Sequence, residues 1–128
     1  MSQENLWGEL PDAQSLVLPQ NILKQQASFL GKMTGNLIEA KVTKSIVPSR
    51  AFSYALEIFS SALAGYSIRI LQIDYDITIY PLELHDMVNQ KKYGVGDEKE
   101  LFHGLKVILQ SENVKKVLSS VLAHAKAK

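Results

Sequence analysis

Apolar and polar residues alternate with a period of two through several short runs between Ile38 and Leu84. Because successive side chains of a β-strand point to opposite faces, this pattern predicts one amphipathic antiparallel sheet. Residues 37–47 and 52–58 form its first two runs, and the turn residues Pro-Ser-Arg at 48–50 separate them. These two runs are expected to form a hairpin.

Two further apolar runs, at residues 66–73 and 77–84, are rich in isoleucine and leucine and predict a third and a fourth strand. The Asp-Tyr-Asp segment at 74–76 is interpreted as a tight turn, with one long strand as the alternative. Pro81 lacks an amide hydrogen and places the end of the fourth strand at a sheet edge or a bulge. The polar, glycine-containing residues 85–96 are interpreted as a mobile loop.

Helical periodicity marks three other segments. Apolar residues recur at helical spacing over 19–34 and over 98–110. Asp97 and Glu100 form a capping-box pattern at the start of the second segment, and Ser111 is placed to cap a third helix. The last helix has the clearest apolar stripe of the three.

The expected order is therefore α-β-β-β-β-α-α. It predicts an α+β fold with a four-stranded antiparallel sheet and the helices packed on one face. We expect residues 18–126 to form a single domain and residues 1–17 to form an irregular N-terminal arm.

Composition narrows the function classes. The 128 residues carry 14 basic and 13 acidic side chains and no cysteine. Disulfides, thiolate metal sites and a cysteine nucleophile are excluded, and the balanced charge gives no electrostatic indication of nucleic-acid binding. With no apolar run long enough to cross a membrane and no export signal, we expect a cytoplasmic location.

No motif of known chemistry is present, so metal sites, cofactors and catalytic residues are not predicted. A carboxylate cluster for acid/base chemistry is conceivable from Asp74 and Asp76 at one end of the last predicted strand segment and Glu83, His85 and Asp86 at its other end. A solvated turn followed by an acidic strand end explains these residues better. Basic residues of the first turn and the loop are a possible anion-binding rim, and tyrosines suit an interface. The candidate ligand or partner residues are Trp7, Arg50, Arg69, Asp74, Tyr75, Asp76, Tyr80, His85, Lys91, Lys92 and Tyr93.

The leading hypothesis is a small non-enzymatic binding or interaction module, such as an accessory or inhibitor protein, that contacts another protein or a second copy of itself. The alternative is a small-molecule binder or a simple acid/base enzyme with a pocket between the sheet and the first helix. A homo-oligomer built through an uncovered sheet face or edge is a third hypothesis, based on Ala55, Phe59 and Leu71. Trp7 is expected to anchor the arm on its own domain or, failing that, on a neighbouring subunit.

Overall fold

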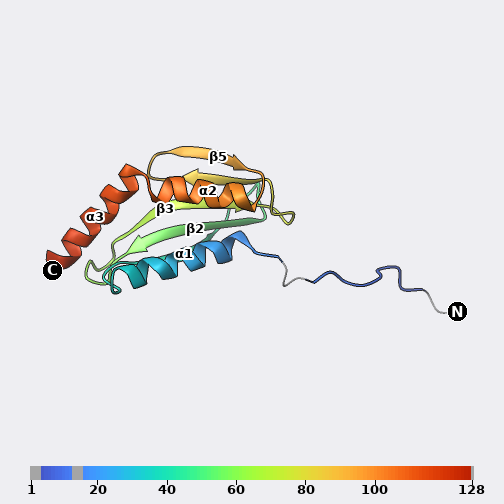
Figure 1. Cartoon of the computed structure of the whole chain (residues 1–128), viewed down its shortest axis with the longest axis horizontal. Helices are drawn as coiled ribbons and strands as arrows, with labels where there is room; N and C mark the ends of the chain where they lie inside the picture. Colours follow the sequence, from blue (N-terminus) through green and yellow to red (C-terminus); the bar gives the residue numbers. More distant parts are fainter. Residues whose placement is uncertain (1–3, 13–15, 128) are drawn as a thin grey trace.

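The computed structural model describes residues 4–12 and 16–127. The described chain has an α+β fold in which a helix, a five-stranded antiparallel sheet and two further helices follow one another (Figure 1). In chain order the elements are α1 (Pro19–Met33), β1 (Glu39–Ser45), β2 (Phe52–Phe59), β3 (Ser67–Tyr75), β4 (Leu82–Asp86), β5 (Lys91–Val95), α2 (Glu98–Leu109) and α3 (Glu112–Ala127).

The sheet is a simple meander in which each strand pairs with the next one along the chain. The prediction of four strands is wrong, because part of the expected loop at residues 85–96 is a strand. Residues 91–95 form β5, which pairs only with β4. The alternation in β5 is carried by Tyr93 and Val95 alone, between lysines and a glycine, so its sequence does not resemble a strand.

The connection between β3 and β4 also differs from the prediction. Asp74 and Tyr75 are the last residues of β3, so they form neither the expected turn nor part of one long strand. The turn follows at residues 76–79, where the Ile79 amide donates a hydrogen bond of 2.8 Å to the carbonyl of Asp76. Ile79 adopts a positive φ of 72°, which no regular strand allows.

Pro81 comes immediately before β4 rather than at its end. It therefore does not mark a sheet edge, because β4 lies between β3 and β5. A proline directly before a strand removes no ladder hydrogen bond, so this position is compatible with an internal strand.

The predicted helix signals are confirmed. Pro19 occupies the first turn of α1, where its missing amide is not needed. Asp97 accepts a hydrogen bond of 2.8 Å from the amide of Glu100, whose side chain in turn accepts one of 2.9 Å from Gly96. Ser111 Oγ accepts a hydrogen bond from the amide of Val114 at the start of α3. The N-termini of α2 and α3 are set by hydrogen bonds between residues close in sequence, so the local sequence predicts where these helices begin.

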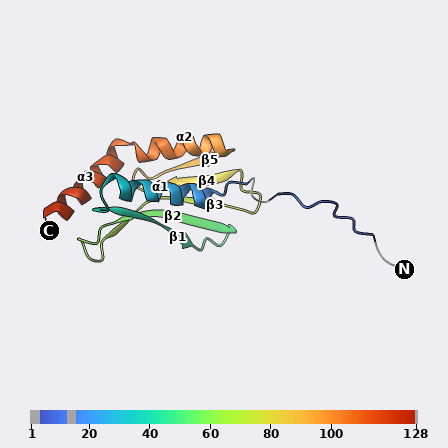
Figure 2. The same cartoon turned by 60° about the horizontal axis from the view of Figure 1, so that its bottom comes forward.

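Helices α1 and α2 lie over the same face of the sheet (Figure 2). Helix α1 packs mainly on β1, and α2 packs on β4 and β5. The core between these layers contains, among others, Leu23, Leu56, Ile73, Leu84, Leu101 and Ile108. The opposite sheet face is largely polar, and Leu71, assigned to that face by sequence, is fully buried in the core instead.

Candidate binding groove

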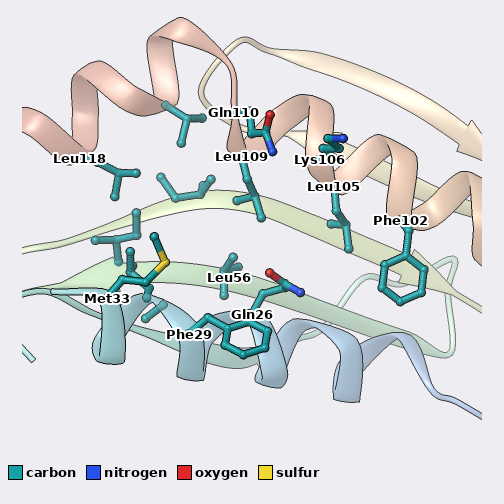
Figure 3. Close-up of a pocket in the computed structure, with 15 residues that line it drawn as sticks. Gln26, Phe29, Met33, Leu56, Phe102, Leu105, Lys106, Leu109, Gln110 and Leu118 are labelled. Carbon is teal, nitrogen blue, oxygen red and sulfur yellow. The ribbon is translucent and has the colours of Figure 1, made fainter. Parts of the chain in front are cut away.

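An apolar groove runs between α1 and α2 over the middle of the sheet (Figure 3). Its volume is about 490 Å³. The α1 wall carries Phe29 and Met33, and the α2 wall carries Phe102 and Leu109. The groove therefore lies over the central strands β2 and β3, where the gap between α1 and α2 leaves them uncovered.

The floor of the groove comes from the central strands. It includes Leu56 and Ile58 of β2 and Ile70 of β3. The pairing of β2 with β3 shifts register at Leu56, so that Ile70 and Leu71 are both accommodated beside it and both are fully buried. Such a bulge allows two consecutive residues to contribute to the packed side of a strand.

Large apolar side chains are exposed along the rim. Met33 is 81% exposed, and Phe29 and Phe102 are each 45% exposed. Exposed apolar groups gathered around a concavity are typical of ligand or protein interaction sites, whereas single ones are ordinary. The polar residues lining the groove are Gln26, Gln110 and Lys106, so the charge it presents among the described residues is positive.

One feature of the α2 sequence is consistent with the groove, although it does not predict the groove by itself. In α2 the apolar positions form two adjacent rows rather than one stripe. Leu101, Leu105 and Ile108 are buried in the core, whereas Phe102 and Leu109 are only partly buried. Phe102 and Leu109 line the groove together with Leu105. An apolar helix face that is wider than packing on the sheet requires indicates a second apolar contact.

The open face of the sheet holds a second cluster, centred on Asp74. Its carboxylate accepts a hydrogen bond of 2.6 Å from Ser53 Oγ and one of 2.9 Å from the Gln72 amide. His85 Nε2 lies 2.9 Å from Asp74 Oδ2. Since neighbouring residues of a strand point to opposite faces, the sheet separates this cluster from the groove, which takes its floor from the other face.

Glu83 is the second anionic centre of the open face. Hydrogen bonds from Lys92 and Arg50, at 2.9 Å and 2.8 Å, lower the pKa of Glu83 to about 2. Arg50 also contacts Asp76 at 2.9 Å, and its pKa is raised mainly by the hydrogen bond to Glu83. The amide of Ala51 and then Arg50 lower the pKa of Asp76.

Asp74, Glu83 and His85 bring possible metal-ligand atoms within 4.8 Å of one another. Each of them is already hydrogen-bonded, and Glu83 is neutralised by two cationic side chains. A metal ion would have to displace those contacts, so the geometry favours a self-satisfied polar network.

The remaining candidate residues from the sequence do not converge. Arg69 pairs with Glu57 at 3.4 Å, while Lys91 is exposed on the edge strand. Because Arg50, Arg69 and Lys92 all have carboxylate partners, the expected anion-binding rim is not assembled from them.

The tyrosines also have separate environments. Tyr75 stacks on Phe52 with ring centroids 5.1 Å apart, and burial raises the pKa of Tyr75 to about 12. Tyr93 packs against the core. The Tyr80 hydroxyl is buried without a hydrogen-bond partner in the described chain, and burial raises its pKa. Trp7 is 85% exposed.

Comparisons with protein-family models, with curated proteins and with solved structures find no match to this chain. Within the described segments, every helix is too short or too polar to span a bilayer. The function is therefore inferred from the geometry of the groove and of the polar network.

Proposed function

We propose that this protein is a non-enzymatic interaction module and that the groove between α1 and α2 holds an apolar segment of a protein partner. The observation that carries the proposal is the combination of a 490 Å³ apolar groove with exposed Phe29, Met33 and Phe102 on its rim. Binding of an apolar peptide in a groove between helices is a common recognition mode, and aromatic residues dominate such interfaces.

The groove and the polar cluster around Asp74 lie on opposite faces of the sheet. This separation supports an interaction module over an acid/base enzyme. An enzyme of the kind considered from the sequence needs its carboxylates at the mouth of the substrate cavity. Asp74 and His85 instead belong to the opposite sheet face, where they bind each other and Ser53. The groove offers Lys106 and two glutamines as its polar groups, a set suited to orienting a ligand.

The test is panning of a phage-displayed library of random peptides against the full chain. We expect enriched peptides to carry at least two large apolar residues, because the walls and floor are apolar. Their binding should be lost in Phe102→Glu and retained in Ile46→Glu, a matched control at an exposed isoleucine of the β1–β2 turn. Both sites are exposed, so both variants should fold, and thermal melting checks this.

Two outcomes contradict the proposal. One is the absence of enriched peptides, or enrichment of peptides that bind Phe102→Glu as well as the wild type. The other is saturable binding of a small amphipathic molecule, for which decanoate is the probe, in the groove of a protein that enriches no peptide.

A further inference from the structure

The N-terminal arm carries the chemistry that the groove accepts. Leu6, Trp7 and Leu10 are 87%, 85% and 79% exposed. Leaving a tryptophan and two leucines in water costs free energy that their burial recovers. Resting on the function proposed above, we infer that the groove takes the arm of a second copy of this chain, so that two copies exchange arms.

Dimensions agree with this occupant. The groove-lining part of α1 runs from Gln26 to Met33 and that of α2 from Phe102 to Gln110. At 1.5 Å per residue these walls are about 10–12 Å long. The stretch from Leu6 to Leu10 covers at most about 13 Å, the length of a fully extended chain, and a kinked backbone is shorter and fits these walls. Gly8, with a positive φ of 67°, kinks the backbone between the two apolar ends of this stretch.

Charge is complementary as well. Residues 1–23 contain no lysine or arginine, whereas Glu4, Glu9 and Asp12 are acidic. The charged side chain that lines the groove is Lys106. Glu4 and Glu9, on the two sides of Trp7, are therefore opposite in charge to Lys106, which favours the encounter.

The arm's direction selects a second copy over the arm's own groove. The described arm residues lie well clear of their own helices and sheet (Figures 1 and 2). These residues do not fill the groove of the same chain, which leaves both the arm and the groove available to a second copy. Reciprocal exchange closes a two-fold dimer, so it does not propagate into a filament.

The area is sufficient for a specific contact. A tryptophan buries about 150–250 Å². Two exchanged tryptophans, with an equal area lost by the residues that cover them, bury about 600–1,000 Å², against the ~1,000 Å² of a specific interface. The four leucines of the two arms add to this total.

Sedimentation velocity of the full chain over a concentration series tests the inference. We expect a monomer–dimer equilibrium, with Trp7 emission moving to shorter wavelength as the dimer forms, since the chain has one tryptophan. The double substitution Trp7→Ala with Leu10→Ala, and separately Phe102→Glu, should each weaken dimerisation by at least about tenfold. Ile46→Glu is the control and should leave the dimer unchanged.

A mixing experiment makes the test specific. The arm-deficient double variant keeps an intact groove, and Phe102→Glu keeps an intact arm. Each variant alone should be monomeric at concentrations where their equimolar mixture forms heterodimers through one arm and one groove. Such a heterodimer keeps one of the two arm–groove contacts, so it should associate more weakly than the wild type and more tightly than either variant alone. A mixture that associates no more tightly than either variant alone, up to millimolar concentration, would overturn arm exchange.

Three further results would overturn arm exchange and would leave the proposed peptide-binding function of the groove to be judged separately. A wild type that stays monomeric at millimolar concentration contradicts arm exchange, as does a dimer that survives in both variants. A concentration-independent blue-shifted Trp7 emission that Phe102→Glu abolishes places the arm in its own groove and equally contradicts exchange. If peptides still bind at Phe102 in any of these cases, the groove function stands without the arm.

Discussion

A Cβ atom added at Gly104 would lie 2.7 Å from Cδ2 of Leu84. Helix α2 therefore approaches strand β4 at a distance that leaves no room for a side chain. Leu84 is fully buried in the core, so it has little freedom to move away. This contact fixes the height of α2 above the sheet and with it one wall of the groove.

Gly104→Ala is expected to lower the free energy of unfolding. Alanine raises helix propensity by about 1 kcal/mol, but overpacking a buried contact costs about 1–3 kcal/mol. The clash at 2.7 Å makes the second effect larger. Urea unfolding measures the difference.

The control is a double-mutant cycle with Leu84→Val, which removes the atoms that the new methyl group meets. The double variant should lose less stability than the sum of the two single variants. Strict additivity, or a more stable Gly104→Ala, contradicts the close approach of α2 to β4.

Glu83 makes stability dependent on acid. Its pKa falls from 4.5 to about 2 in the folded protein because Lys92 and Arg50 stabilise the carboxylate. A carboxyl group with a lowered folded pKa contributes stability above its unfolded pKa, and this is lost as pH falls from about 4.5 towards 2. Because Glu83 is partly exposed, the contribution is about 1 kcal/mol or less.

Glu83→Gln should therefore flatten the loss of stability between pH 5 and pH 2.5, a window that follows from these two pKa values. Urea unfolding at a series of pH values gives the slope. Glu112→Gln, an exposed position in the first turn of α3, is the control and should keep the wild-type slope. An unchanged slope in Glu83→Gln rules out this ion-pair network as the source of acid sensitivity.

Gln90 adopts a positive φ of 56° in the turn between β4 and β5. Glycine accepts this conformation without the steric cost that other L-residues incur, so Gln90→Gly should stabilise the protein by up to about 1 kcal/mol. Thermal melting measures the shift.

Asn89→Gly in the same turn should have the opposite sign. The Asn89 side chain donates a hydrogen bond of 2.8 Å to Asp86, and glycine removes it. If both substitutions destabilise the protein, the assigned turn geometry is wrong.

The structure also indicates which features a sequence can predict. The ends of α2 and α3 are set by Asp97, Glu100 and Ser111 acting within one helical turn, so they are readable locally. The sequence does not predict strand β5, because only Tyr93 and Val95 on its inner face are apolar and Lys91 takes the third position of that face. Its pairing with β4 supplies what the sequence pattern lacks. Ile77 and Ile79 mimic a strand, although Ile77 is exposed and Ile79 has a positive φ.

The groove could not be predicted from the sequence for a different reason. The apolar residues of both helices were correctly placed on amphipathic faces, but their periodicity does not show how far apart two helices pack. That distance follows from α1 packing on β1 while α2 packs on β4 and β5. The sequence indicates that Trp7 is a candidate contact residue, but only the structure shows that its side chain is exposed.

The most direct test of the groove uses methionine methyl groups as reporters. The chain has three methionines, of which Met33 lies on the groove rim and Met87 in the turn after β4. In the full chain carrying Trp7→Ala and Leu10→Ala, labelled with ¹³C-methyl methionine, a synthetic peptide of residues 4–12 is the titrant. The account predicts a saturable shift of the Met33 signal with the Met87 signal unchanged. A Met33 signal that stays fixed at millimolar peptide, or moves no more than that of Met87, contradicts binding of the arm in the groove.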